Sequence, residues 1–137
     1  MSVQETLREL VAIDSVSSRS NAEIISYLTA RCEAGGLSVK PFPHIDDAGT
    51  EKTNLVALTG AELSDKPAIQ LALVGHTDTV PYDPAWTEAL RLTERDGQLF
   101  GRGTCDTKAF IASALTAIEG IDLSTLKKPL ALFFTSD

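Results

Sequence analysis

Hydrophobic residues recur at the three- and four-residue spacing of amphipathic helices in three segments of the chain, at residues 2–13, 20–34 and 107–118. Ser2 and Glu5 form a capping-box pattern at the start of the first segment. Ser20 and Glu23 repeat this pattern at the start of the second segment, and a pair of glycines at 35–36 marks its end. The spacing therefore predicts three helices.

Apolar or alternating runs between these segments predict β-strands at residues 37–42, 53–59, 68–75 and 129–134, with a β-hairpin at 90–100. Pro41 and Pro43 place the first strand at an edge of the sheet, because proline offers no N–H group to a neighbouring strand. Residues 68–75 form a continuous apolar run, as in strands with both faces covered by helices, so we expect this strand to be central. Asp96-Gly97 is the turn signal of the hairpin.

Helices that alternate with apolar strands indicate the α/β fold class. We expect a three-layer αβα sandwich with a mostly parallel central sheet, in which the last predicted helix connects two parallel strands within one domain. Reactive groups in such sheets lie beyond the carboxyl ends of the strands, where three polar clusters are expected to meet. These clusters are His76-Thr77-Asp78, Thr104-Cys105-Asp106 and Thr135-Ser136-Asp137.

Charge and composition exclude several classes of function. The formal net charge of -7 argues against binding to nucleic acid or to anionic lipid, since both attract clustered lysine and arginine. No apolar run approaches the roughly 20 residues that span a bilayer. Residues 1–5 lack the basic and apolar segments of a signal peptide, and Cys32 and Cys105 lie too far apart to suggest a disulfide framework. We therefore expect a cytoplasmic protein.

His76 and Asp78 are the first candidates for chemistry. They lie two residues apart, so their side chains leave an extended backbone on the same face. One nitrogen of an imidazole can bind zinc while a neighbouring carboxylate accepts the proton on the other nitrogen. In the alternative interpretations, His76 is a structural or solvated residue at the end of a strand, or Asp78 is itself a metal ligand.

Asp106 precedes the third predicted helix, where an aspartate by itself is usually an N-cap. The segment 101–103 (Gly-Arg-Gly) changes this interpretation, because glycines let the backbone approach closely and direct the carboxylate toward His76. A carboxylate has two oxygens and can bridge two zinc ions, which would activate a shared water molecule for attack on a carbonyl group. The expected reaction is hydrolysis.

Other residues are weaker candidates, and Asp137 is the only one of them that we consider as a further ligand. We interpret Cys105 as a packing residue, His44 as a residue of a surface loop, and Trp86 as a side chain that covers the core or lines the cleft. Neither the third glycine of a dinucleotide fingerprint nor a P-loop lysine accompanies residues 101–103, and no Gly-x-Ser-x-Gly motif occurs. Nucleotide binding and serine hydrolysis are therefore poor alternatives.

Two motifs carry a resemblance to a known family. Residues 75–81 (GHTDTVP) and 101–106 (GRGTCD) resemble the opening signatures of the acetylornithine deacetylase and succinyl-diaminopimelate desuccinylase family of zinc hydrolases. The resemblance implies that His76 binds one metal, that Asp78 orients its imidazole, and that Asp106 bridges two zinc ions, with cobalt as an alternative metal. It also implies hydrolysis of an N-acyl amino acid, with acetylornithine as the expected substrate and arginine biosynthesis as the setting.

The same resemblance makes residues 1–137 the amino-terminal portion of the catalytic domain, without the dimerisation domain from which we expect a homodimer. In the family, two glutamates follow directly after the strand that here ends at Asp137, and further ligands come later, so the chain alone is expected to be inactive. Thr107 and Ala109 stand where methionine and glycine are common. These departures leave an alternative, a structural or partner-binding module derived from the family.

Overall fold

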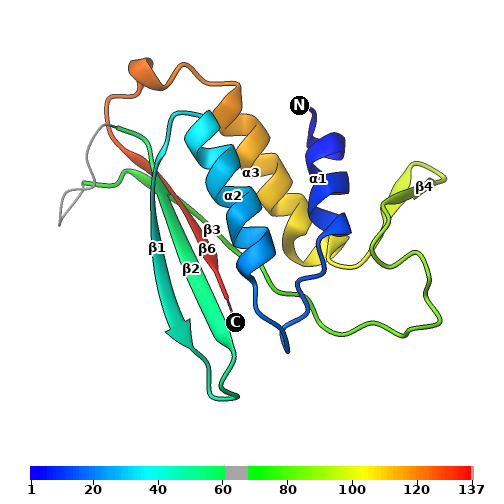
Figure 1. Ribbon diagram of the computed structural model, residues 1–137. Coiled ribbons are helices and arrows are strands. Elements are labelled where there is room, and N and C mark those ends of the chain that lie inside the picture. The colour runs from blue at the N-terminus through cyan, green and yellow to red at the C-terminus, as the bar shows by residue number, and fades with distance from the viewer. Residues whose placement is uncertain (61–67, 137) are drawn as a thin grey trace.

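The computed structural model describes residues 1–60 and 68–136. Its main elements are α1 (Val3–Ala12), α2 (Ala22–Ala34), β1 (Ser38–Ile45), β2 (Glu51–Leu58), β3 (Leu71–His76), β4 (Thr93–Arg95), β5 (Gln98–Phe100), α3 (Ala109–Glu119) and β6 (Leu130–Thr135). In this part of the chain, α2 and α3 lie over one face of a four-stranded sheet and α1 packs against α3, while the β4–β5 hairpin stands apart (Figure 1). Within the same residues, every helix is too short or too polar to cross a membrane.

The three predicted helices are present, but one of the two predicted capping boxes is wrong. In α1 the Ser2 hydroxyl accepts a hydrogen bond from the Glu5 N–H, and the Glu5 carboxylate accepts one from the Ser2 N–H, which confirms the first box. The box predicted at residues 20–23 does not form, since the N-cap of α2 is Asn21 and its side chain makes no cap bond. Asn21 instead bonds both backbone groups of Thr53, which attaches the start of α2 to β2.

The sheet confirms the α/β class, but in the described residues it is mixed rather than mostly parallel. The strand order is β1-β2-β6-β3, and β6 runs parallel to β3, as predicted, but antiparallel to β2. β1 pairs antiparallel with β2 at the predicted edge.

The central position predicted for residues 68–75 is wrong for the described residues, because β3 forms the second edge of the sheet. Its Val74 side chain is 57% exposed and its Leu71 side chain 51% exposed. A continuous apolar run therefore does not show that both faces of this strand are covered. The described residues provide one helical layer and the sheet, which are two of the three layers expected.

The predicted hairpin turn is confirmed. β4 and β5 pair antiparallel around Asp96 and Gly97, whose φ angles are 51° and 72°. Positive φ at both central residues is the conformation that Asp-Gly pairs favour in two-residue hairpin turns.

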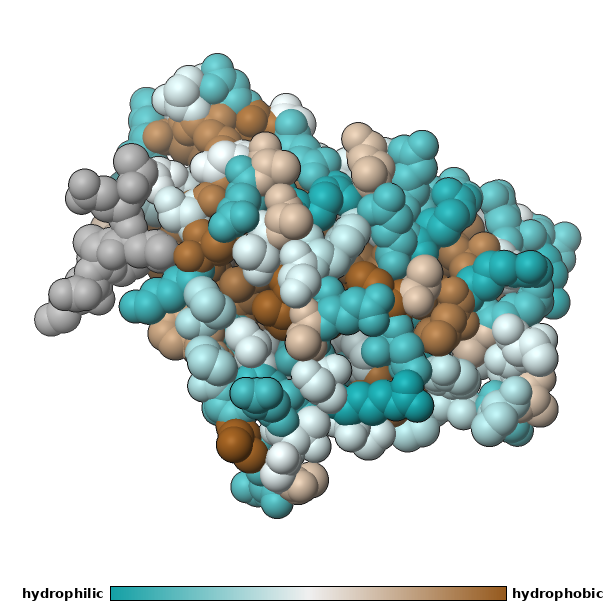
Figure 2. All heavy atoms as spheres, in the orientation of Figure 1, coloured by the Kyte–Doolittle hydropathy of each residue, from teal (hydrophilic) through white to brown (hydrophobic). Residues whose placement is uncertain are grey.

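The hydrophobic core lies between the helices and the sheet. Leu10 of α1, Leu28 of α2, Ile111 of α3 and Leu132 of β6 are all 0% exposed and belong to one cluster. The surface that carries the helices is largely hydrophilic, with hydrophobic residues visible mainly between polar ones (Figure 2). Burial of one face on each helix thus drives the packing of the layer.

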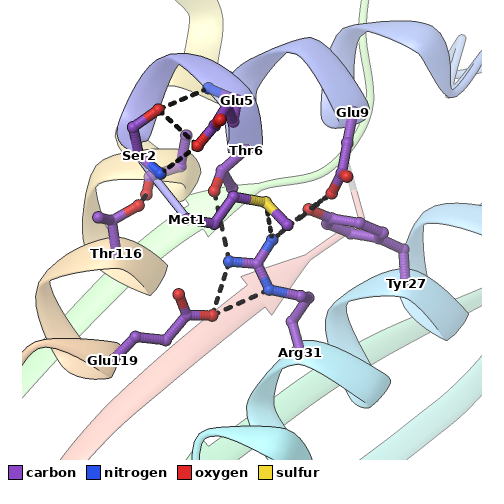
Figure 3. A network of polar contacts seen from close by, with 10 residues as sticks. Met1, Ser2, Glu5, Thr6, Glu9, Tyr27, Arg31, Thr116 and Glu119 are labelled. Carbon is purple, nitrogen blue, oxygen red and sulfur yellow. Dashed lines mark hydrogen bonds and ion pairs between the residues drawn. The ribbon is translucent and has the colours of Figure 1, made fainter.

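Arg31, near the end of α2, joins the three helices through a polar network (Figure 3). Its guanidinium donates to the Glu119 carboxylate of α3 at 2.6 and 2.9 Å and to the Tyr27 hydroxyl at 2.6 Å. Tyr27 in turn donates to Glu9 of α1 at 2.7 Å. Burial, together with this bond to Glu9, raises the pKa of Tyr27, so the hydroxyl stays protonated and can donate.

Arg31→Met is expected to lower the free energy of unfolding by about 1–3 kcal/mol, because it removes the hydrogen bonds of a guanidinium whose side chain is only 13% exposed. Urea denaturation of the 137-residue chain measures this. The matched control is Arg91→Met, whose side chain is 73% exposed and pairs with Glu88 on the surface. Its loss should be below about 0.5 kcal/mol, and equal losses in the two variants would contradict the role given to Arg31.

Candidate metal centre

The predicted polar clusters meet at the carboxyl ends of β3 and β6. His76 is the last residue of β3, and the N–H of the next residue, Thr77, donates to the carbonyl oxygen of Thr135 on β6 at 2.8 Å. A cavity of about 410 Å³ opens here. Its lining residues are His76, Asp78, Val80, Gly101, Arg102, Gly103, Thr104, Cys105 and Asp106.

Two carboxylates hold the imidazole of His76 from opposite sides. Nε2 lies 2.8 Å from Asp106 Oδ1, while Nδ1 lies 3.2 Å from Asp78 Oδ1 and 3.1 Å from the Asp78 carbonyl oxygen. Burial by itself would lower the pKa of His76, but the hydrogen bond with Asp106 and the charge of Asp78 outweigh it and raise this pKa. The structure therefore brings together the three residues that the sequence selected.

Two glycines let the loop of residues 101–108 come close to α1 and to the segment that follows β3. A Cβ atom at Gly103, where φ is +83°, would lie 2.8 Å from a methyl carbon of Thr79. A Cβ at Gly101 would lie 2.8 Å from a methyl carbon of Val11. Real Cβ atoms do not approach so closely, so the close approach predicted for the Gly-Arg-Gly segment is confirmed.

Asp106 is not the N-cap of α3, which begins at Ala109 and has Lys108 at its N-cap position. The backbone of Asp106 is non-helical, with φ −132° and ψ 94°, and its carboxylate is 77% exposed. The following Thr107 stands where methionine is common in the resembled family. Its hydroxyl donates to the His76 carbonyl oxygen at 3.0 Å, so this departure adds a bond between the loop and β3.

Lys108 is a positioning residue that the sequence interpretation missed. Its side chain is 1% exposed, and Nζ donates to the carbonyl oxygens of Leu10 and Ile13 at the C-terminal end of α1, both at 2.8 Å. Burial lowers the pKa of Lys108 to about 8. One sequence signal could have found it: Lys108 lies three and four residues before Ile111 and Ala112, on the buried face of α3.

The segment after α1 also contacts the chain just beyond His76 and Asp78. The Thr79 N–H donates to the Ser15 carbonyl oxygen, and the Ser17 N–H donates to the Thr79 carbonyl oxygen, both at 2.9 Å. Residues 10–17 therefore contact both segments that carry the candidate ligands.

Other candidates from the sequence take different positions. Cys105 is exposed and lines the cavity, so its interpretation as a packing residue is wrong. His44 belongs to β1 rather than to a surface loop, and its Nε2 lies 3.3 Å from the Ser136 hydroxyl. Asp137 lies outside the described residues.

The donors at the cavity fit a zinc-type metal ion in kind. Zinc accepts imidazole nitrogen and carboxylate oxygen, and His76 and Asp106 direct one of each toward the other. Asp78 contacts the second ring nitrogen, which is the position of a residue that orients a ligand. Between residues 1 and 60 and between 68 and 136, no three His, Cys, Asp or Glu side chains gather closely enough to hold a metal. The described residues could thus supply only part of a coordination sphere.

Comparison with known proteins defines the class. Residues 72–137 match the family described as Peptidase family M20/M25/M40, and the chain belongs to this family. Acetylornithine deacetylase of Myxococcus xanthus is 53% identical over 135 residues, which are 98% of this chain and 34% of that protein. Acetylornithine deacetylase of Klebsiella pneumoniae (strain 342) is 40% identical over 141 residues, covering 97% of this chain and 35% of that protein.

The fold is also that of human carnosine dipeptidase 1, with a TM-score of 0.79 and 22% identity over 98% of this chain and 31% of that structure. The chain therefore spans about a third of the length of these relatives.

Lys108→Met is expected to change how stability depends on pH. The pKa of Lys108 is about 8 in the folded protein against 10.5 for an ordinary lysine, so the unfolded chain binds more protons between these two values. The free energy of unfolding of the wild type should therefore rise from about pH 8 to about pH 10.5, and the variant should lack this contribution. Urea unfolding across that range, without added metal, measures the difference. Lys127→Met, at an exposed position, should keep the wild-type slope; an unchanged slope in Lys108→Met would refute the expectation.

The two cysteines are expected to differ sharply in reactivity. Cys32 is 1% exposed and burial raises its pKa to about 12, whereas Cys105 is exposed at the cavity. Because the thiolate is the reactive form, Ellman's reagent at neutral pH should label Cys105 quickly and Cys32 only on unfolding. Cys105→Ser should remove the fast phase and Cys32→Ser should retain it. Two thiols reacting equally fast in the folded chain would be inconsistent with the structure.

Proposed function

We propose that residues 1–137 form the amino-terminal part of the catalytic domain of a longer metal-dependent hydrolase that cleaves the amide bond of an N-acyl amino acid. The approach of His76 Nε2 to within 2.8 Å of Asp106 Oδ1, with Asp78 on the other side of the ring, is the observation that supports this most directly. Acetylornithine is the proposed substrate, because the relatives with 53% and 40% identity are acetylornithine deacetylases.

Each of the three residues has a separate role in this proposal. His76 would bind one zinc ion and Asp106 would bridge two, for which its exposed carboxylate has a second oxygen. Bound zinc would lower the pKa of a water molecule and polarise the carbonyl group of the amide. Asp78 would accept a hydrogen bond from the Nδ1–H group of His76 and so keep Nε2 available for the metal.

The remaining parts of the mechanism would come from outside the described residues. Hydrolysis also needs a general base and a group that stabilises the oxyanion, and each metal needs further ligands. We therefore propose that the 137-residue chain is inactive by itself. We also propose that the complete protein is a cytoplasmic homodimer. Its role in arginine biosynthesis would follow from acetylornithine as the substrate.

In the full-length protein, His76→Ala is expected to reduce deacetylation of acetylornithine to background, because it removes the one imidazole among the described residues that line the cavity. Asp78→Asn should retain the metal but lower activity about 10- to 100-fold, as is typical when the partner of a histidine ligand is lost. Release of ornithine measures both effects.

Asp47→Asn, in the exposed turn after β1, is the matched control and should keep full activity. Turnover that survives in His76→Ala would show that the ligand role is wrong. Equal activity in Asp78→Asn and the control would refute the orienting role of Asp78 but leave the ligand role of His76 standing.

A further inference from the structure

Arg102 is the one lysine or arginine among the described residues that line the cavity. It lies between the two glycines of the loop, and its backbone N–H donates to the Ala89 carbonyl oxygen at 2.7 Å. The backbone of this cation is therefore fixed, and Arg102 lines the same cavity as His76 and Asp106.

The guanidinium of Arg102 is held in place but lacks an ionic partner within the described residues. Its Cζ lies 5.3 Å from the centre of the Trp86 ring, a cation–π distance. Its Nε is buried and has no hydrogen-bond acceptor in this part of the chain. Trp86 itself is 37% exposed and is absent from the cavity lining, so it supports Arg102 from outside.

Arg31 provides an internal comparison, since its guanidinium also lies over an aromatic ring, 5.6 Å from the centre of Tyr27. Arg31 is neutralised by the carboxylate of Glu119, with N–O 2.6 Å. A half-buried guanidinium is usually satisfied by such an acceptor. Arg102 also lies over an aromatic ring but has no carboxylate partner among the described residues. Such a guanidinium is suited to bind an anionic group of a ligand.

We infer that Arg102 binds the free carboxylate of the substrate, an inference that rests on the proposed hydrolysis of an N-acyl amino acid. In such a compound the scissile amide nitrogen and the carboxylate are attached to the same carbon atom. The group that binds the carboxylate must therefore lie in the same cavity as the groups that act on the amide. A guanidinium can bind both carboxylate oxygens at once, which fixes the orientation of the molecule as well as its charge.

The test compares two substrates in the full-length protein, N-acetylornithine and the same compound with its carboxylate converted to a neutral carboxamide. The wild type should lose about 10- to 100-fold in kcat/KM on this conversion, the value of a charge-assisted hydrogen bond. Arg102→Met should hydrolyse the two compounds with nearly equal kcat/KM. Arg102→Lys should recover part of the preference, and it also serves if the methionine variant is unstable.

Each outcome is decisive for one of the two proposals. A variant that slows both substrates by the same factor, and so keeps the wild-type preference, would show that Arg102 is only structural. A wild type that hydrolyses both compounds equally well would overturn the carboxylate site and leave the hydrolase function standing. A wild type that hydrolyses neither these nor other N-acyl amino acids would refute the proposed function itself. Arg91→Met, the exposed control, should retain the wild-type preference.

Discussion

The buried ammonium group of Lys108 attaches the loop that carries Asp106 to the last carbonyl groups of α1. Burying a charge is costly unless it is hydrogen-bonded, and here two backbone oxygens at the negative end of a helix dipole accept its protons at 2.8 Å. The chain then continues into Ser15–Ser17, which pairs with Thr79 just beyond the His76 segment. Both halves of the site therefore depend on one support, and a shift of α1 would move His76 relative to Asp106.

The elements that could be predicted from the sequence were those set by local physics. Helical spacing, the Ser2–Glu5 box and the Asp96-Gly97 turn act within a few residues, so the pattern and the structure agree. The start of α2 could not be predicted in the same way, because Asn21 bonds to Thr53, 32 positions away, and this bond displaces the local cap. The prediction of a central position for β3 was wrong for the same reason, since an apolar run does not identify which strands or helices lie beside it.

The candidate site shows the same division. His76, Asp78 and Asp106 were found because each follows a strand or a glycine-rich segment, where topology brings reactive groups to one edge. Lys108 was missed as a contributor, and Arg102 was not singled out, because a charged residue is taken to be solvated unless something shows otherwise. What places Lys108 in the interior is a pair of carbonyl groups 95 and 98 positions earlier in the chain, which no local pattern contains.

The position of Arg102 in the cavity would give the proposed substrate one favourable orientation. Asp78 and Asp106 flank His76 and make that side attractive to cations and repulsive to anions, whereas Arg102 offers a positive group that the described residues leave without an ion-pair partner. An N-acyl amino acid has a neutral amide and an anionic carboxylate on adjacent groups. Bound with its carboxylate at Arg102, it would direct the amide toward His76 and toward the metal that His76 is proposed to hold. Zinc ions at His76 and Asp106 would offset the negative charge of the two aspartates, so repulsion from Asp78 and Asp106 alone would not orient the substrate. The planar guanidinium, which can bind both carboxylate oxygens at once, would instead fix how the substrate lies in the cavity.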